Sequence, residues 1–243
     1  MDILYIVVPA YNEAANIENL INDWYPIVEK HNGDGLSRLV VVNDGSKDDT
    51  LELARQAAAT RDKLVVLDKE NGGHGDSVLF GYEYAIENKA DYIFQTDSDG
   101  QTLPEEFERF WVRRRDYNGI IGKRLVREDG FSRKIVEVVL CMVLWVVFGV
   151  KVPDANAPFR LMKREALAGY IKLLPKHYNL PNAVITALYV YFGDRVAFMP
   201  ITFRPRQGGK NSINIRKIFA IGIHAVRDFI LIRRRVEKTG RRK

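Results

Sequence analysis

Asp97, Asp99 and Gln101 place three oxygen-bearing side chains at alternate positions just after the short apolar run 92–94. Alternate residues of an extended segment point the same way, so all three can face one crevice. Two carboxylates and an amide oxygen suit Mg²⁺ or Mn²⁺, which keep several water or phosphate ligands and so connect a protein to a diphosphate. An Asp-Ser-Asp-Gly segment is also good turn chemistry, so the neighbouring segments must decide between a metal site and a turn.

The composition limits the class of protein. The chain has 243 residues, 47% of them hydrophobic, which suits one large domain or a domain with an appendage. The single cysteine, Cys141, excludes an intramolecular disulfide and a cysteine-rich metal site, and it fits a reducing cytoplasm. The amino terminus lacks a basic start and a small-residue cleavage site, so we expect no secretory signal. A net charge of +6 allows nucleic acid, an anionic membrane or phosphorylated ligands as partners.

The elements that must position these residues follow from the pattern of the first half. Short apolar, β-branched runs alternate with helical segments, which predicts a parallel α/β sheet. The expected strands are 4–8, 39–42, 64–67, 92–96 and 119–121, and the expected helices are 14–28, 49–59, 75–87 and 104–114.

Polar segments follow four of these strands: 9–13, 43–46, 71–75 and 97–101. In parallel α/β sheets, ligands bind beyond the carboxyl ends of the strands. The four segments therefore predict one site at one edge of the sheet.

The second half has a different character. Residues 135–150 are almost all apolar, but Glu137 interrupts the run and it is shorter than the roughly 20 residues that span a bilayer, which favours a core or interfacial helix. We expect a loop over 154–160, a strand over 196–202, a basic loop over 204–212 and a terminal amphipathic helix from 213 to about 235 with a basic end. Accordingly, we divide the chain into a main domain, 1–212, and a terminal helix with its tail, 213–243.

Three segments resemble motifs of a known family: Val-Pro-Ala-Tyr-Asn-Glu at 8–13, Val-Asn-Asp-Gly-Ser-Lys-Asp-Asp-Thr at 42–50, and Asp-Ser-Asp-Gly-Gln at 97–101. In this order and spacing they are similar to the sugar-donor motifs of the inverting glycosyltransferases of family 2. Within that family the chain resembles the dolichol-phosphate mannose synthases and the bacterial polyprenyl-phosphate sugar transferases. The resemblance covers about 3–213 and implies a Rossmann-like GT-A fold, a mostly parallel α/β sheet flanked by helices, with Mg²⁺ or Mn²⁺ bound.

The resemblance also implies roles for individual residues. The residues that it implies for binding the nucleotide sugar are Pro9, Tyr11, Glu13, Asp44, Asp97, Ser98, Arg206 and Lys210. Metal binding falls to Asp97, Asp99 and Gln101, and binding of the acceptor phosphate falls to Arg124 and Arg133, since guanidinium groups suit phosphate. Asp99, Arg124 and Arg206 are the implied catalytic residues. Turn or cap chemistry is the alternative for the acidic residues, and a solvated basic face is the alternative for Arg133.

No carboxylate occurs in 175–182, where relatives that glycosylate a sugar hydroxyl carry an acidic general base. A hydroxyl must lose a proton as it attacks, whereas a phosphate monoester, with a second pKa near 6, is already an anion at pH 7. A phosphate acceptor therefore needs no base. His177 could still serve as one, but a lone loop histidine is more often structural.

These observations predict metal-dependent, inverting transfer of a hexose from GDP-mannose or a UDP-hexose to a polyprenyl or dolichyl phosphate. The amphipathic helices predict peripheral attachment to the cytoplasmic face of a membrane, with no nucleic acid as partner; a homo-oligomer is left open. The alternatives are transfer to a sugar hydroxyl of a lipid-linked glycan or polysaccharide, a basic nucleic-acid-binding module, and a catalytically silent scaffold with the same fold.

Overall fold

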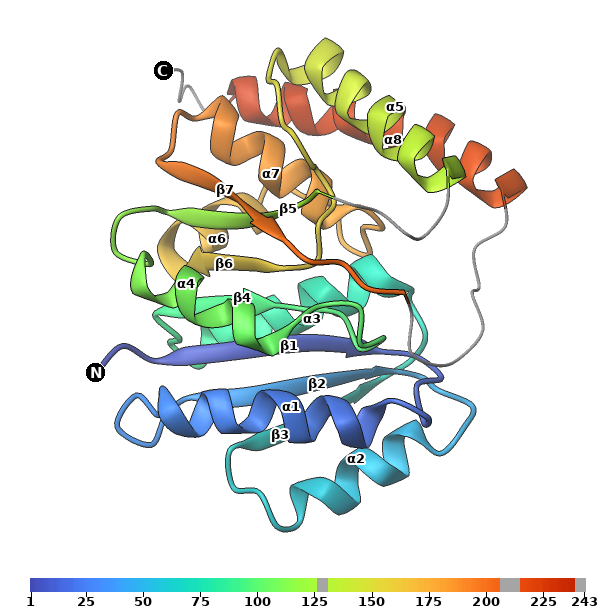
Figure 1. Cartoon of the computed structure of the whole chain (residues 1–243). Coiled ribbons are helices and arrows are strands. Elements are labelled where there is room, and N and C mark those ends of the chain that lie inside the picture. Colours follow the sequence, from blue (N-terminus) through green and yellow to red (C-terminus); the bar gives the residue numbers. More distant parts are fainter. Residues whose placement is uncertain (126–130, 206–214, 239–243) are drawn as a thin grey trace.

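A seven-stranded sheet with the order β3-β2-β1-β4-β6-β5-β7 runs through the molecule (Figure 1). The computed structural model describes residues 1–125, 131–205 and 215–238, with the backbone alone for 131–135 and 215–224. The strands are β1 (Leu4–Ala10), β2 (Arg38–Asp44), β3 (Leu64–Lys69), β4 (Tyr92–Gln95), β5 (Gly119–Arg124), β6 (Arg160–Lys163) and β7 (Val196–Ile201).

Parallel pairing brings the predicted polar loops to one edge of this sheet. β1 lies between β2 and β4 and is parallel to both, and β3 is parallel to β2. β6 is the exception, because it is antiparallel to β4 and β5, and it places Arg160 directly opposite Gln95. The loops after β1, β2, β3 and β4 therefore start from the same edge.

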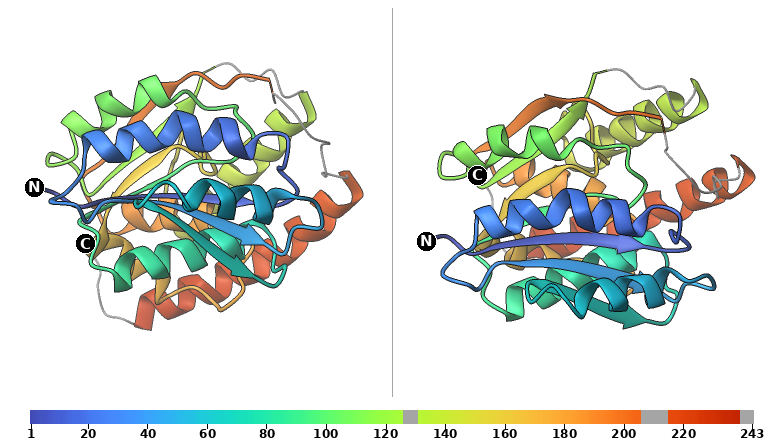
Figure 2. Two further views of the ribbon diagram at one scale, coloured as in Figure 1. Left: turned by 90° about the horizontal axis from the view of Figure 1, so that it is seen from below. Right: turned by 60° about the horizontal axis from the view of Figure 1, so that its bottom comes forward.

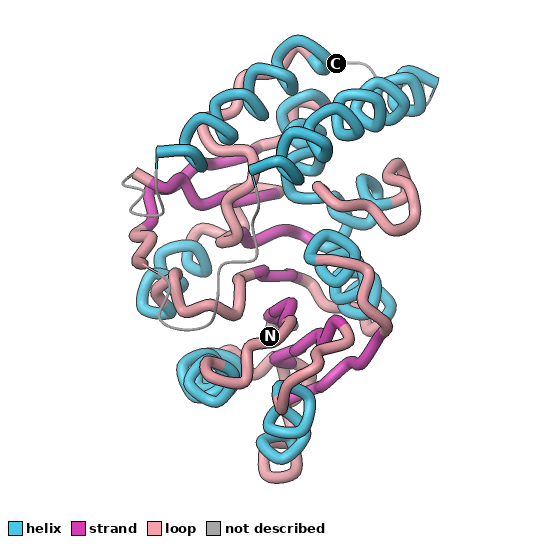
Figure 3. Tube along the Cα trace, turned by 90° about the vertical axis from the view of Figure 1, so that its right-hand side faces the viewer, coloured by secondary structure: helices cyan, strands magenta, loops and turns pink. Residues whose placement is uncertain are grey.

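The helices cover both faces of the sheet, as Figures 2 and 3 show. They are α1 (Ile17–Lys30), α2 (Thr50–Ala58), α3 (His74–Glu87), the 3₁₀ turn η1 (Pro104–Glu106), α4 (Phe107–Val112), α5 (Phe131–Phe148), α6 (Arg164–Ile171), α7 (Pro181–Tyr191) and α8 (Ile215–Lys238). Alternate residues of β1 face opposite ways: Tyr5 and Val7 pack with α3 and α7, whereas Ile6 and Val8 pack with α1 and α4. Both faces of the sheet are thus buried, as the continuous apolar strands predict.

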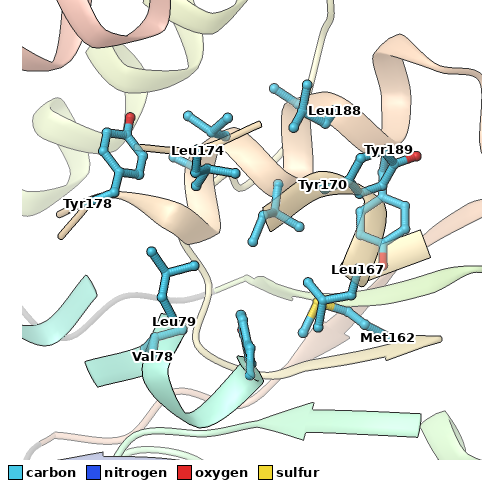
Figure 4. Close-up of a cluster of buried hydrophobic side chains, with 14 of the residues drawn as sticks. Val78, Leu79, Met162, Leu167, Tyr170, Leu174, Tyr178, Leu188 and Tyr189 are labelled. Atoms are coloured by element: carbon cyan, nitrogen blue, oxygen red, sulfur yellow. The ribbon is translucent and has the colours of Figure 1, made fainter. Parts of the chain in front are cut away.

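The sequence did not predict β6, α6 or α7. The expected loop over 154–160 ends one residue early, because Arg160 is the first residue of β6. In α7 every residue from Pro181 to Tyr189 is buried, so the helix has no polar face and no amphipathic period to detect. Figure 4 shows why: Leu188 and Tyr189 of α7 lie among side chains from α3, β6 and α6.

The helices α5 and α8 pack against each other outside the sheet (Figure 1). Leu144 and Phe148 of α5 and Phe229 and Val236 of α8 are buried in the same core as α3 and α7. The expected boundary between 212 and 213 lies outside the described residues and stays a prediction. Among the described helices, none combines the length and the apolarity that crossing a membrane requires.

Candidate functional site

Hydrogen bonds join the loop after β1 to the loop after β2. Asn12, whose φ of 53° places it in the left-handed region, accepts a bond from the Lys47 backbone N–H at 2.8 Å. The Asn12 N–H donates in turn to Ser46 Oγ at 3.0 Å, and the Glu13 N–H donates to Thr50 Oγ1 at 2.8 Å. The two loops therefore form one rigid rim, from which the ring of Tyr11 is exposed.

Pro9 and Glu13 lie below this rim. Pro9 is a buried residue of β1, and the buried carboxylate of Glu13 accepts a hydrogen bond from Asn16 Nδ2 at 2.7 Å. The backbone carbonyl of Glu13 accepts the N–H groups of Asn16 and Ile17 and so begins α1. In this structure both residues shape the rim from beneath.

Asp44, at the end of β2, organises the loop after β3. Its carboxylate accepts hydrogen bonds from Lys69 Nζ at 2.8 Å and from the backbone N–H groups of Gly72 and Gly73 at 2.9 Å. Burial opposes ionisation, but the hydrogen bonds from Lys69 and Gly72 outweigh it and lower the pKa of Asp44. Asp44 is therefore a buried carboxylate that holds the loop over 70–73 in place.

Lys69 also pairs with one carboxylate oxygen of Asp76 in α3 at 2.8 Å. The other oxygen of Asp76 lies 2.9 Å from His177 Nδ1, so both oxygens of this carboxylate have a partner. Gly72 fits this cluster only without a side chain, since a Cβ there would collide with the Asp76 carboxylate. The His177 ring is 81% exposed, so its other nitrogen faces solvent. Lys69 and Asp76 were not among the predicted site residues.

The loop over 96–102 after β4 is closed on itself. Thr96 and Thr102 share a hydrogen bond of 2.7 Å between their hydroxyls, and Asp99 Oδ1 accepts the backbone N–H of Gln101 at 3.2 Å. Ser98 is buried, whereas the Asp97 side chain is 28% exposed. Asp97 Oδ1 lies 3.7 Å from His74 Nε2 at the start of α3 and accepts a hydrogen bond from Gln95 Nε2 at 3.2 Å.

Gln101 attaches this loop to the segment after β7. Its buried side-chain amide donates to the Arg204 carbonyl at 2.8 Å, and the Arg204 N–H donates back to the Gln101 carbonyl at 2.8 Å. A role for the amide oxygen in metal binding stays a prediction.

The described residues contain no group of three or more histidine, cysteine or acidic side chains arranged to enclose a metal ion. The side chains that are present nevertheless fit Mg²⁺ or Mn²⁺, because two carboxylates two residues apart are hard oxygen ligands on a fixed loop. Such an ion would take its remaining ligands from water and from a bound diphosphate.

Arg124, at the end of β5, lies in a cluster of ion pairs. Its guanidinium group is nearly buried and donates to both oxygens of Asp154, at 2.8 and 2.7 Å, and to Glu137 of α5 at 3.2 Å. The role of Arg124 in binding an acceptor phosphate stays a prediction. Arg133 lies in α5, where only the backbone is described, and Arg206 and Lys210 lie outside the described residues.

Comparison with known proteins found a matching family and several proteins of similar sequence. The model of the family described as "Glycosyl transferase family 2" matches residues 5–171. A UDP-N-acetylglucosamine–dolichyl-phosphate N-acetylglucosaminyltransferase of Methanococcus voltae is 24% identical over 68% of this chain and 71% of its own length. A dolichyl-phosphate beta-glucosyltransferase of Trichomonas vaginalis is 29% identical, over 66% and 51%. An undecaprenyl-phosphate 4-deoxy-4-formamido-L-arabinose transferase of Shewanella sediminis is 25% identical, over 74% and 54%. The chain thus spans from about half to 71% of the length of these relatives.

Solved structures share the fold. Glucosyl-3-phosphoglycerate synthase from Mycobacterium tuberculosis, solved with Mn²⁺, UDP and phosphoglyceric acid, has a TM-score of 0.68 at 20% identity, covering 96% of this chain and 78% of that one. S. aureus TarS 1–349 with UDP-GlcNAc has a TM-score of 0.64 at 18% identity, covering 95% and 67%. The predicted GT-A fold is confirmed at this level.

Proposed function

This chain belongs to glycosyl transferase family 2 and is a glycosyltransferase, and we propose that it transfers a hexose from a nucleotide diphosphate sugar to a polyprenyl or dolichyl phosphate. The observation that carries the proposal is the edge of the sheet where Asp97 and Asp99 follow β4 beside the rim of Tyr11. The relatives named for dolichyl and undecaprenyl phosphate support the class of acceptor.

The rim after β1 and β2 suits a nucleoside. Tyr11 is an exposed aromatic ring on a backbone fixed by three hydrogen bonds, so it can contact a base at little cost in conformational entropy. Pro9 and Glu13 hold this rim, and Asp44 holds the adjacent loop over 70–73. We assign Ser98, Arg206 and Lys210 to the sugar and diphosphate.

Asp97 and Asp99, with Gln101 as a third ligand, would hold Mg²⁺ or Mn²⁺. The ion would neutralise the charge that develops on the departing diphosphate. Asp97 and Asp99 fit this task because the bond between Thr96 and Thr102 closes their loop before any ligand arrives. Orientation fixed in advance lowers the cost of forming the complex.

Arg124 and Arg133 are the proposed acceptor residues. A phosphate monoester is ionised at pH 7, so the protein need only position its oxygen near the anomeric carbon of the sugar. The bidentate pair of Arg124 with Asp154 implies that the acceptor exchanges with a carboxylate when it binds. Arg206 would stabilise the charge that develops in the transition state.

Peripheral attachment to the cytoplasmic face of a membrane would bring the lipid acceptor to this site. One side of α5 exposes Val138, Met142, Trp145 and Val146, which recur at helical spacing. The neighbouring α8 exposes Ile230 and Leu231, followed by the basic side chains of Arg234, Arg235 and Lys238. An apolar stripe beside basic residues is the pattern of helices that lie in a membrane surface.

A second function is favoured by one observation, the pair of His177 and Asp76. Asp76 orients the His177 ring and leaves its other nitrogen exposed, as a general base that removes a hydroxyl proton requires. The alternative acceptor is therefore a sugar hydroxyl of a lipid-linked glycan or polysaccharide. In that case His177→Gln would abolish turnover, whereas with a phosphate acceptor the variant would keep most of it.

The deciding experiment incubates purified protein with Mn²⁺ or Mg²⁺, a panel of nucleotide sugars and either polyprenyl phosphate or an oligosaccharide acceptor. We expect a lipid-linked sugar that forms only with polyprenyl phosphate and a divalent ion. Product formed only with the oligosaccharide would replace this proposal with the hydroxyl alternative.

A further inference from the structure

Four polar side chains lie buried beneath the loop that carries Asp97. Tyr82 of α3, Gln95 of β4 and Arg160 of β6 are fully buried, and Asn182 at the start of α7 is 2% exposed. Buried polar groups cost free energy unless they are hydrogen-bonded, so such a cluster has to be satisfied internally.

The hydrogen bonds of this cluster lead toward Asp97. The Tyr82 hydroxyl donates to Gln95 Oε1 at 3.0 Å, and Gln95 Nε2 donates to Asp97 Oδ1 at 3.2 Å. The same hydroxyl lies 3.3 Å from Asn182 Oδ1. A hydroxyl has one hydrogen, which the shorter contact takes, so Asn182 joins the row only when its amide turns over and its nitrogen faces Tyr82. The three side chains then form a row, in which Asn182, Tyr82 and Gln95 each donate in the direction of the Asp97 carboxylate.

Arg160 supports the row from the neighbouring strand. It lies opposite Gln95 in the sheet and donates to the Asn182 carbonyl at 3.0 Å and to the Ala157 carbonyl at 2.8 Å. Burial lowers the pKa of Arg160, and the charges of Asp154 and Asp97 act in the opposite direction.

The direction of the row matters because a glutamine amide can present either its nitrogen or its oxygen. The oxygen would repel the Asp97 carboxylate, and the nitrogen attracts it. A donor at Gln95 Oε1 fixes the attractive orientation, and the Tyr82 hydroxyl is that donor.

We propose that Gln95 is a positioning residue for Asp97, and that Tyr82 and Asn182 hold its amide in the orientation that aims the carboxylate at a divalent cation. The inference rests on the proposed function, in which Asp97 binds the metal of the nucleotide-sugar complex. Groups that orient metal ligands in this way typically change metal affinity by 10- to 100-fold.

The test measures Mn²⁺ binding by the decrease of the free-ion electron paramagnetic resonance signal, with UDP or GDP present. We expect Tyr82→Phe and Gln95→Met to weaken Mn²⁺ binding by about tenfold. Turnover of both variants should recover at saturating Mn²⁺, which a folding defect would not allow. Tyr189→Phe is the matched control, because Tyr189 is fully buried and its hydroxyl has no hydrogen-bond partner among the described residues.

The outcomes separate the two proposals. Wild-type protein that binds no Mn²⁺ with either nucleotide would overturn the proposed function. Wild-type affinity in Tyr82→Phe and Gln95→Met, or an equal loss in Tyr189→Phe, would overturn the positioning role. If one variant does not fold, the other carries the test alone.

Discussion

The ammonium group of Lys69 joins two carboxylates that come from different segments, Asp44 of β2 and Asp76 of α3, each at 2.8 Å. All three side chains are largely buried, with 14% of Lys69 exposed. Despite the opposing effect of burial, the hydrogen bonds to Asp44 and Asp76 raise the pKa of Lys69. One residue therefore holds the end of β2, the loop over 70–73 and the start of α3 together.

Lys69→Met should destabilise the protein by roughly 3 kcal/mol at pH 7, because it removes the cation that two buried carboxylates share. Asp44 has a lowered pKa when folded, so its contribution is present above the ordinary aspartate pKa and is lost as the pH falls through the folded value. Lys69 has a raised pKa, so its contribution is complete below the ordinary lysine pKa and is lost as the pH rises through the folded value. The difference between variant and wild type should thus be largest between about pH 4 and pH 10.

Urea unfolding at pH 3 and pH 7 measures this difference. Lys30→Met is the control, since Lys30 pairs with Glu108 at the same 2.8 Å distance but is 62% exposed. Lys30→Met should change the free energy of unfolding by less than about 1 kcal/mol. A Lys69→Met effect as small as the control's would mean that the cluster does not stabilise the fold.

Asp99→Ala should lower turnover at least about hundredfold and leave the free energy of unfolding within about 1 kcal/mol of wild type, because a metal ligand at a strand end contributes to chemistry more than to packing. The measurement is sugar transfer at saturating Mn²⁺. Asp116→Ala is the control, since Asp116 is an exposed residue just before β5, at the other edge of the sheet. Full activity of Asp99→Ala would remove this residue from the metal site.

The sequence predicted the part of the site whose residues lie close together in the chain, directly after a strand. Asp97, Asp99 and Gln101 follow a strand, and parallel pairing alone brings them to the edge that holds Tyr11 and Asp44. Gln95 and Tyr82 could not be recognised in this way, because the bonds of the Tyr82 hydroxyl join residues 13 and 100 positions apart on separate elements. Residue spacing carries no information about such contacts.

At the scale of elements, the start of α3 is packed directly against the loop before α7. A Cβ at Gly75 would collide with the backbone carbonyls of Tyr178 and Asn179. Gly75→Ala should therefore destabilise the protein by about 1–3 kcal/mol, since neither backbone segment can move easily. The same change at Gly169 in α6, where a Cβ meets nothing within 4 Å, should stabilise by up to about 1 kcal/mol.

Urea unfolding of the two variants tests the packing, because intrinsic helix propensity alone would stabilise both. Equal stabilisation by the two substitutions would contradict close docking of α3 against the loop before α7. A loss of stability confined to Gly75→Ala would confirm it.

Most elements of the first half were predicted within three residues of their observed bounds, because their apolar period is clear. The helix expected over 104–114 is instead the turn η1 followed by the short helix α4, which ends at Val112. β6 escaped prediction since it has four residues and begins with an arginine, a residue rarely buried in a strand. Arg160 can lie there only because α7 and the segment over 155–157 supply carbonyl oxygens to its guanidinium group, and these contacts are not visible in the sequence.

At the scale of the whole molecule, Arg160 connects the two halves of the proposed site. On one side it supports Asn182 and, through it, the row toward Asp97. On the other side it donates to the carbonyls of Ala155 and Ala157, in the segment directly after Asp154, the partner of Arg124. The proposed metal and acceptor residues therefore share one buried support.

The apolar stripe of α5 and the basic end of α8 belong to two helices that pack against each other, and we propose that a membrane surface contacts both. Each basic residue near an anionic surface contributes about 1 kcal/mol, and burial of a large apolar side chain contributes roughly 2 kcal/mol. Trp145→Glu should therefore weaken binding to vesicles with anionic lipid at least about tenfold, and binding of the wild type should fall as salt is raised.

Val112→Glu is the control, because Val112 is an exposed residue of α4, which packs on the opposite face of the sheet. Truncation after Ile232 would be a poorer test, since it also removes the buried Val236 from the core. Vesicle flotation measures the bound fraction, and a wild-type protein that binds no vesicles but forms stable dimers in sedimentation would show that a second copy covers this stripe instead.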